Sequence, residues 1–294
     1  MRLQPVGLVR VQGLLFSLVA LVLVLLSTQF SFDFSIPLLL GLSLIILLLG
    51  VPHGALDPIF AQQIFGVKGL LGWSLFAMMY VGLAAGVVLF WYVFPTLWLV
   101  GFLLISVWHF SADLAPHTVW LARLSYGSAI IILPVFRFSN ELTVLFSFLI
   151  DTSASVVLVA ALQVLLVPVL VLVVMSALLV VRADRLSALE LLSVSALMLL
   201  VPPLPAFTLY FCLMHGARHI LRTKQYMAQV TVKSMFGVML LPMLGTLVLM
   251  LLGWFFAAGQ SLEQGVVQLV FVGLAALTAP HMCLVQRAFS ASGR

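Results

Sequence analysis

The chain has 294 residues, of which 64% are apolar and only 7% are charged, and its formal net charge is +5. Soluble globular domains carry about 25% charged residues, so this composition excludes a soluble fold. The few basic charges are too diluted for nucleic-acid binding. Apolar stretches long enough to cross a bilayer recur along the whole sequence, which predicts an all-α, polytopic integral membrane protein.

The first apolar run, from Leu14 to Leu26, follows Arg2 and Arg10 and so resembles the core of a signal peptide. No small-x-small cleavage site follows this run, however, and another apolar segment begins almost at once. The run is therefore interpreted as a first transmembrane helix.

Breaks at proline, glycine and charged residues divide the sequence into ten expected spans within a single domain, 1–294. The spans lie near residues 9–27, 36–53, 69–93, 96–113, 118–136, 154–181, 186–202, 205–222, 235–257 and 264–286. The stretch 141–150 is ambiguous: it fits a re-entrant or interfacial piece, or the start of the sixth span. If it crosses the membrane alone, the sidedness of every later span is reversed.

The distribution of charge favours this count, with both termini in the cytoplasm. The expected cytoplasmic segments then carry Arg2, Arg10, Lys68, Arg123, Arg182, Arg185, Arg222, Lys224, Lys233, Arg287 and Arg294. The expected outer loops carry Asp33, Glu141, Asp151 and Glu263, with Arg137 as the clear exception. This asymmetry is the positive-inside pattern of a multi-pass protein in the cell membrane.

Five of the six histidines end even-numbered spans, and ionisable groups inside a membrane are costly enough to suggest a function. They are His53, His109, His215, His219 and His281, whereas His117 stands alone in a loop. The predicted topology brings the five to one depth near the cytoplasmic face. A single membrane histidine usually forms a hydrogen bond to a neighbouring helix, but five at one level indicate a metal site.

The spacing within these segments points to ligands and their hydrogen-bond partners. His215 and His219 are four residues apart, hence on one helix face, and can bind one metal ion. Asp57 and Asp113 each follow a histidine, His53 or His109, by four residues, and can accept that ring's free N–H or serve as ordinary cap residues. Neutral imidazoles suit iron, zinc, copper or nickel.

Other side chains near the histidines have more ordinary interpretations. Cys212 is expected to be a buried packing thiol rather than a soft ligand, and two cysteines in apolar segments imply no disulfide framework. Arg218 is expected to extend towards the membrane interface. The flanking aromatic residues can line an apolar slot or simply pack in the core: Trp108, Phe110, Tyr210 and Phe211.

Four histidine motifs together resemble, in order and spacing, the Brp/Blh family of membrane β-carotene 15,15′-dioxygenases. They are Pro52-His53-Gly54-Ala55-Leu56-Asp57, Trp108-His109-Phe110 with Asp113, His215-Gly216-Ala217-Arg218-His219, and Pro280-His281. The first and third are the more specific, and the resemblance extends from about residue 50 to about residue 285.

The resemblance implies an enzyme that uses Fe(II) and O₂ to split β-carotene at its central double bond into two retinal molecules, which commonly serve a microbial rhodopsin. Carried over by motif, the catalytic iron ligands are His53, His109, His215 and His219. His281 matches a family histidine whose role stays open, alongside Asp57 and Asp113 as candidates for supporting or substrate contacts.

Two other classes remain. A membrane di-iron hydroxylase or desaturase needs about eight histidines by its usual pattern, more than the six present. A transporter is expected to show broken helices in paired repeats, and no convincing repeat is visible. A haem-binding subunit is separated from all of these by its absorption spectrum.

Overall fold

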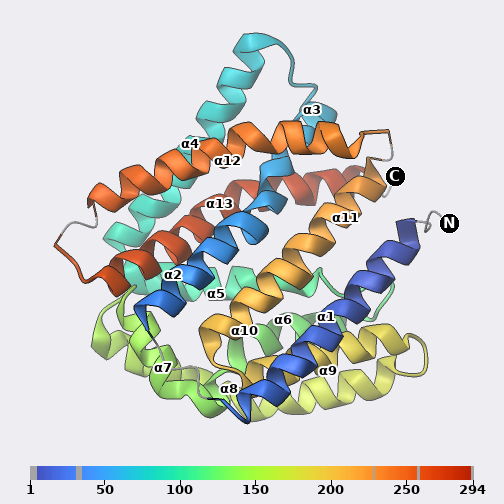
Figure 1. Ribbon diagram of the computed structural model, residues 1–294, viewed down its shortest axis with the longest axis vertical. Helices are drawn as coiled ribbons and strands as arrows, with labels where there is room; N and C mark the ends of the chain where they lie inside the picture. Colours follow the sequence, from blue (N-terminus) through green and yellow to red (C-terminus); the bar gives the residue numbers. More distant parts are fainter. Residues whose placement is uncertain (1–4, 31–34, 228, 257–258, 293–294) are drawn as a thin grey trace.

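The computed structural model describes residues 5–30, 35–227, 229–256 and 259–292. Arg2, Asp33 and Arg294, which entered the topology prediction, lie outside these ranges. Every regular element in the described ranges is helical (Figure 1). The elements are α1 (Pro5–Ser27), α2 (Ile36–Ile45), η1 (Ile46–Gly50), η2 (Val51–Leu56), α3 (Asp57–Phe65), α4 (Gly69–Val93), α5 (Pro95–Ser111), α6 (Trp120–Ile132), α7 (Val135–Ser147), α8 (Thr152–Val180), α9 (Arg185–Leu200), α10 (Pro203–Leu209), η3 (Tyr210–Gly216), α11 (Ala217–Tyr226), α12 (Val232–Phe256) and α13 (Leu262–Ser292).

The all-α, multi-pass architecture is confirmed, but fewer than ten helices qualify as membrane spans. Among the described residues, six segments are long and apolar enough to cross a bilayer: Gly7–Ser27, Ile36–Phe65, Gly69–Val93, Thr152–Val180, Val232–Phe255 and Leu262–Val285. A seventh is added if α6 and α7, which bend by 57° at their junction, form one broken span.

The other expected spans fall short for separate physical reasons. The helix expected at 96–113 has only 17 residues, and the one expected at 186–202 has only 16. The segment expected at 205–222 is divided into α10, η3 and α11. The ambiguous stretch 141–150 falls largely in α7, the second arm of the bent pair. A parity argument based on ten crossings is therefore not supported by this fold.

Helical irregularities are concentrated where the histidines lie. η1 and η3 are π-helical, and η2 is a 3₁₀-helix that begins beside Pro52. π-Helical turns occur mostly as single-turn insertions in α-helices, and they are frequent at functional sites. The two π-helical segments pack against each other. Gly50 allows this approach, since a Cβ there would lie 2.5 Å from the Phe211 ring.

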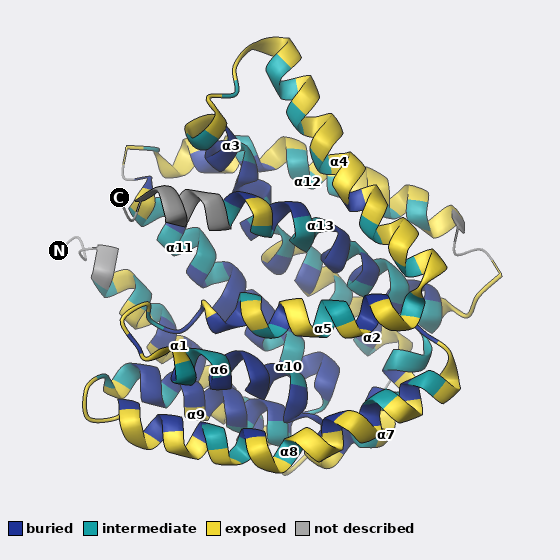
Figure 2. Cartoon of the chain, turned by 180° about the vertical axis from the view of Figure 1, so that it is seen from behind, coloured by how far each residue is buried: buried dark blue, intermediate teal, exposed yellow. Residues whose placement is uncertain are grey.

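The remaining helices pack around these segments. α1 lies against α9, α5 against α6, α6 against α8, and α13 against α4. Figure 2 shows that α6 and α9 are largely buried, whereas α4 exposes apolar side chains along most of its length. Exposed residues such as Leu70, Leu71 and Met79 are what a lipid-facing helix requires.

Arg218 is buried inside the bundle, which corrects the expectation that it extends to the membrane interface. Its guanidinium forms two hydrogen bonds with the Glu190 carboxylate of α9, at 2.6 and 2.8 Å, and a third with Gln12 of α1 at 2.9 Å. Gly13 lies directly over this ion pair, and a Cβ there would lie 1.9 Å from Glu190 Oε1. The charge stays inside because the fold supplies a buried carboxylate.

Glu190→Ala should destabilise the fold strongly, because it leaves the Arg218 guanidinium buried without its counterion. Breaking such a buried pair typically costs about 3–5 kcal/mol. The melting temperature of the detergent-purified protein measures the effect. Arg185→Ala, on the exposed face of the same helix, is the matched control and should leave the melting temperature nearly unchanged. Equal shifts for the two variants would contradict this account.

Candidate metal centre

Five histidine rings from four separate parts of the chain converge inside the bundle. The ring centroid of His53 (η2) lies 4.8 Å from that of His215 (η3), 5.6 Å from that of His219 (α11) and 5.2 Å from that of His281 (α13). The ring centroid of His109 (α5) lies 4.7 Å from that of His215. The five histidines therefore lie together, as a shared site requires, and we call them the histidine cluster.

The ring nitrogens of the cluster are left facing one another. The Nε2 atoms of His109 and His215 lie 3.1 Å apart. His219 Nε2 and His281 Nε2 are buried and have no hydrogen-bond partner among the described residues. Candidate ligand atoms of His53, His109 and His281 all lie within 4.8 Å of one another. Converging imidazole nitrogens, two of them without a partner among the described residues, are a donor set that suits a transition metal, so the residues present fit a metal ion.

Asp113 anchors one side of the histidine cluster through His215. His215 Nδ1 lies 3.0 and 3.1 Å from the two Asp113 oxygens, and the Tyr210 hydroxyl donates to Asp113 Oδ2 at 2.5 Å. Tyr210 and His215 are five residues apart in a π-helix, whose wider turn places such residues on one face. Because a carboxylate only accepts, His215 carries its proton on Nδ1 and keeps Nε2 free.

Asp57 anchors the opposite side through His281. His281 Nδ1 donates to Asp57 Oδ1 at 2.7 Å, and the Tyr80 hydroxyl of α4 donates to Asp57 Oδ2 at 2.9 Å. The Asp57 and His281 side chains are both almost completely buried. A carboxylate thus orients a histidine on each side of the cluster.

The predicted pairing of each aspartate with the histidine four residues before it is wrong. His53 Nδ1 donates instead to the Gly50 carbonyl, and neither carboxylate bonds to the histidine of its own segment. Residues four apart lie on one face of a regular α-helix, but not of a 3₁₀-helix. His53 lies in a 3₁₀-helix with about three residues per turn. The helix that carries His109 ends at Ser111, before Asp113.

Two arginines of α11 position the backbone around Asp113. Arg218 donates to the Asp113 carbonyl at 2.9 Å, and Arg222 donates to the carbonyls of Ala112 at 2.6 Å and Asp113 at 2.8 Å. These contacts cap the free carbonyls at the end of α5. The Arg218–Glu190 pair is thereby linked through Asp113 to His215.

Aromatic rings pack directly on the histidines. Phe211 stacks on His215 with ring centroids 5.5 Å apart, and Phe110 lies 5.1 Å from the same ring. Trp108 is 64% exposed, so neither interpretation given for it, lining an apolar slot or packing in the core, is supported. Cys212 is buried and packs near the Ile45 carbonyl, as a packing thiol should.

His117 lies outside the histidine cluster, as its loop position predicted. Its side chain is exposed, and Nε2 lies 3.0 Å from Asp184 Oδ2, at the cap of α9. Partial burial acts to raise the pKa of Asp184, but hydrogen bonds from Ser187 and His117 outweigh it and hold the pKa below its ordinary value. This pair therefore belongs to a helix cap rather than to the metal centre.

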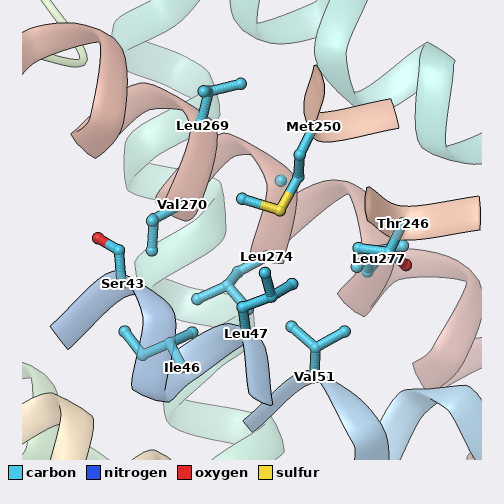
Figure 3. Close-up of a pocket in the computed structure, with 11 residues that line it drawn as sticks. Ser43, Ile46, Leu47, Val51, Thr246, Met250, Leu269, Val270, Leu274 and Leu277 are labelled. Atoms are coloured by element: carbon cyan, nitrogen blue, oxygen red, sulfur yellow. The ribbon is translucent and has the colours of Figure 1, made fainter. Parts of the chain in front are cut away.

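A cavity lies between three parts of the chain, namely α2 with η1, α12 and α13 (Figure 3). Its lining includes Val51 and Leu277, which precede His53 and His281 in the sequence by two and four residues. Its walls are almost entirely hydrocarbon, because the hydroxyls of Ser43 and Thr246 bond to carbonyls of their own helices. On α13 the cavity is lined by Val270, Leu274 and Leu277. His281 continues this spacing on the same helix face.

Several partners in this site were not singled out from the sequence: Tyr80, Gly50, Gln12, Glu190 and Arg222. Tyr80 gave only a weak signal, as one phenol within an apolar span. The Gly50 contact is made by the backbone and gave no signal at all.

Comparison with known proteins agrees with this geometry. A sequence model of the β-carotene 15,15′-dioxygenase family matches residues 44–287. The β-carotene 15,15′-dioxygenase of an uncultured marine bacterium, 66A03, is 30% identical over 261 residues, which cover 83% of this chain and 92% of the relative. No solved structure matches the chain. By these two matches the chain belongs to the β-carotene 15,15′-dioxygenase family.

Proposed function

We propose that this protein cleaves β-carotene at its central 15,15′ double bond with O₂, giving two retinal molecules, at an Fe(II) ion held by the histidine cluster. The observation that carries the proposal is the convergence of five imidazole rings inside an apolar bundle, with two buried Nε2 atoms that have no partner among the described residues. Membership of the family supports the substrate and the reaction.

We assign the iron ligands to His53, His109, His215 and His219, as the family motifs imply. The Nδ1–H groups of His53 and His215 are held by the Gly50 carbonyl and by Asp113, which leaves Nε2 of both rings for a metal. Neutral nitrogen donors without a thiolate suit iron. When bound, the iron supplies the activation of O₂. The two oxygen atoms of one O₂ supply the two product aldehydes, so no reducing cosubstrate is needed.

The chain's own residues bind the substrate, orient the ligand rings and exclude water from the site. Asp113 and Gly50 hold the histidine rings, while Phe110 and Phe211 cover the rings with hydrocarbon. A carotenoid dissolves only in the bilayer, so a site inside apolar membrane helices can be reached by the substrate without passage through water. The substrate's hydrocarbon arm is proposed to pack along the apolar surface of α13 and η1 that lines this cavity, with the helices parting to admit it.

The topology and the fate of the product complete the proposal. The positive-inside distribution favours cytoplasmic termini in the cell membrane. The described start of α1 and the end of α13 lie towards the same side of the molecule in Figure 1. Retinal released into the bilayer is then available to a microbial rhodopsin.

Expression in a β-carotene-producing bacterium should bleach the cells and yield retinal, measured by chromatography of the extracted pigments. His53→Ala, His109→Ala, His215→Ala and His219→Ala should each abolish retinal, because each removes a ligand. His117→Ala, outside the cluster, is the control and should keep full activity. Retinal production that survives His219→Ala would contradict the four-ligand assignment.

The purified protein should carry about one iron per chain, with nitrogen ligands at roughly 2.0–2.2 Å by analogy with other imidazole–metal bonds. Metal analysis and X-ray absorption measure these two quantities. Treatment with an Fe(II) chelator should remove activity, and Fe(II) should restore it. Two iron ions per chain would point to a di-iron oxygenase instead, and a Soret band would indicate haem.

Gly273→Leu should lower turnover of β-carotene without changing the iron content, because the new side chain enters the cavity. A Cβ at Gly273 meets no atom within 4 Å, so the fold has room for it. Gly237→Leu in α12 is the matched control, since its Cβ also meets nothing and it does not line the cavity. Initial rates in detergent with saturating Fe(II) provide the measurement. Equal activity of both variants would remove the cavity from the substrate path.

A further inference from the structure

His281 is held by a hydrogen-bonded unit that repeats the arrangement around His215. In both units a tyrosine hydroxyl donates to one carboxylate oxygen, and the carboxylate accepts from histidine Nδ1. One unit joins Tyr210, Asp113 and His215, and the other joins Tyr80, Asp57 and His281. The second unit draws its members from α4, α3 and α13, which pack together at this point.

The hydrogen bonding assigns the free nitrogen of His281. Asp57 Oδ1 accepts from Nδ1 at 2.7 Å, so the proton lies on Nδ1 and Nε2 presents a lone pair. Nε2 is buried and has no hydrogen-bond partner among the described residues. A buried lone pair without a partner is costly. The ring centroid of His281 lies 4.9 Å from that of His219 and 5.2 Å from that of His53, so His281 belongs to the same cluster.

The charge of Asp57 gives a second reason for a cation at this nitrogen. Asp57 is 1% exposed, and its partners are a phenol and an imidazole. No Lys or Arg forms an ion pair with it in the part of the chain that the structure describes. A metal ion at Nε2 supplies both the charge and the partner.

We propose that His281 is a fifth ligand of the iron, and that Asp57 and Tyr80 are positioning residues that orient its ring. The inference rests on the proposed iron centre and adds to the four ligands that the family motifs imply. The five histidines would together hold the iron, which would supply the activation of O₂ when bound. The carotenoid is then held beside the metal by the apolar walls that continue from His281 along α13.

The test uses the full-length protein, purified in detergent and loaded with Fe(II) without oxygen. His281→Ala, Asp57→Asn and Tyr80→Phe are compared with the parallel variants Asp113→Asn and Tyr210→Phe. Competition with a chelator gives the iron dissociation constant, and the near-infrared ligand-field bands of Fe(II) report the number of ligands. His117→Ala and Tyr92→Phe, whose side chains are exposed, are the matched controls.

Asp57→Asn should weaken iron binding by about 10–100-fold, as loss of such a partner typically does, and excess Fe(II) should restore its activity. Tyr80→Phe should also weaken iron binding, but by a smaller factor. His281→Ala should change the ligand-field bands, and added imidazole should restore both the bands and the affinity. Melting temperatures show which variants remain folded, and Asp57→Asn preserves size where His281→Ala leaves a gap.

Wild-type iron affinity and unchanged ligand-field bands in His281→Ala would overturn the inference. Loss of activity in that variant with iron binding intact would also overturn it, because His281 would then act on substrate or O₂ rather than on the metal. Failure of the proposed function is a different result: the unaltered protein would bind no iron and make no retinal.

Discussion

Two carboxylates buried in an apolar bundle impose the constraint on which the rest of this structure depends. Removing a carboxylate from water costs several kcal/mol even after the protein relaxes, so each oxygen needs a donor. Asp113 takes its donors from Tyr210 and His215, and Asp57 takes them from Tyr80 and His281. Satisfying the carboxylates therefore orients two imidazoles, with their second nitrogens turned towards the centre of the bundle.

The helices around the site depart from ideal geometry to meet this requirement. A regular α-helix through 210–216 would not place both Tyr210 and His215 against one aspartate, whereas the π-helix does. The extra backbone carbonyl of such a segment needs a donor, and Gln12 of α1 supplies one to Leu213 at 2.6 Å. The same Gln12 accepts from Arg218 at 2.9 Å. The ion pair, the π-helix and the histidine thus form one connected polar network.

The apolar surroundings and the polar network have different roles in the site. Phenylalanine rings pack on the histidines, and a cavity with hydrocarbon walls lies between neighbouring helices. The buried carboxylates place negative charge where a divalent cation is stabilised, and a low effective dielectric strengthens that attraction. The histidine cluster thereby lies inside a bundle whose outer surface is apolar, where a lipid-soluble substrate is found.

The sequence by itself determined the membrane class, the five histidines and the family resemblance, because composition and motif spacing are local properties of the chain. It did not determine the number of spans, since four expected crossings proved short, bent or divided. The length of an apolar run does not reveal where a helical turn widens or where a helix breaks. Only the tertiary structure decided which group holds which histidine. Asp57 meets a ring 224 residues away and Asp113 one 102 residues away, because helix packing, rather than spacing along the sequence, brings donors to a buried carboxylate.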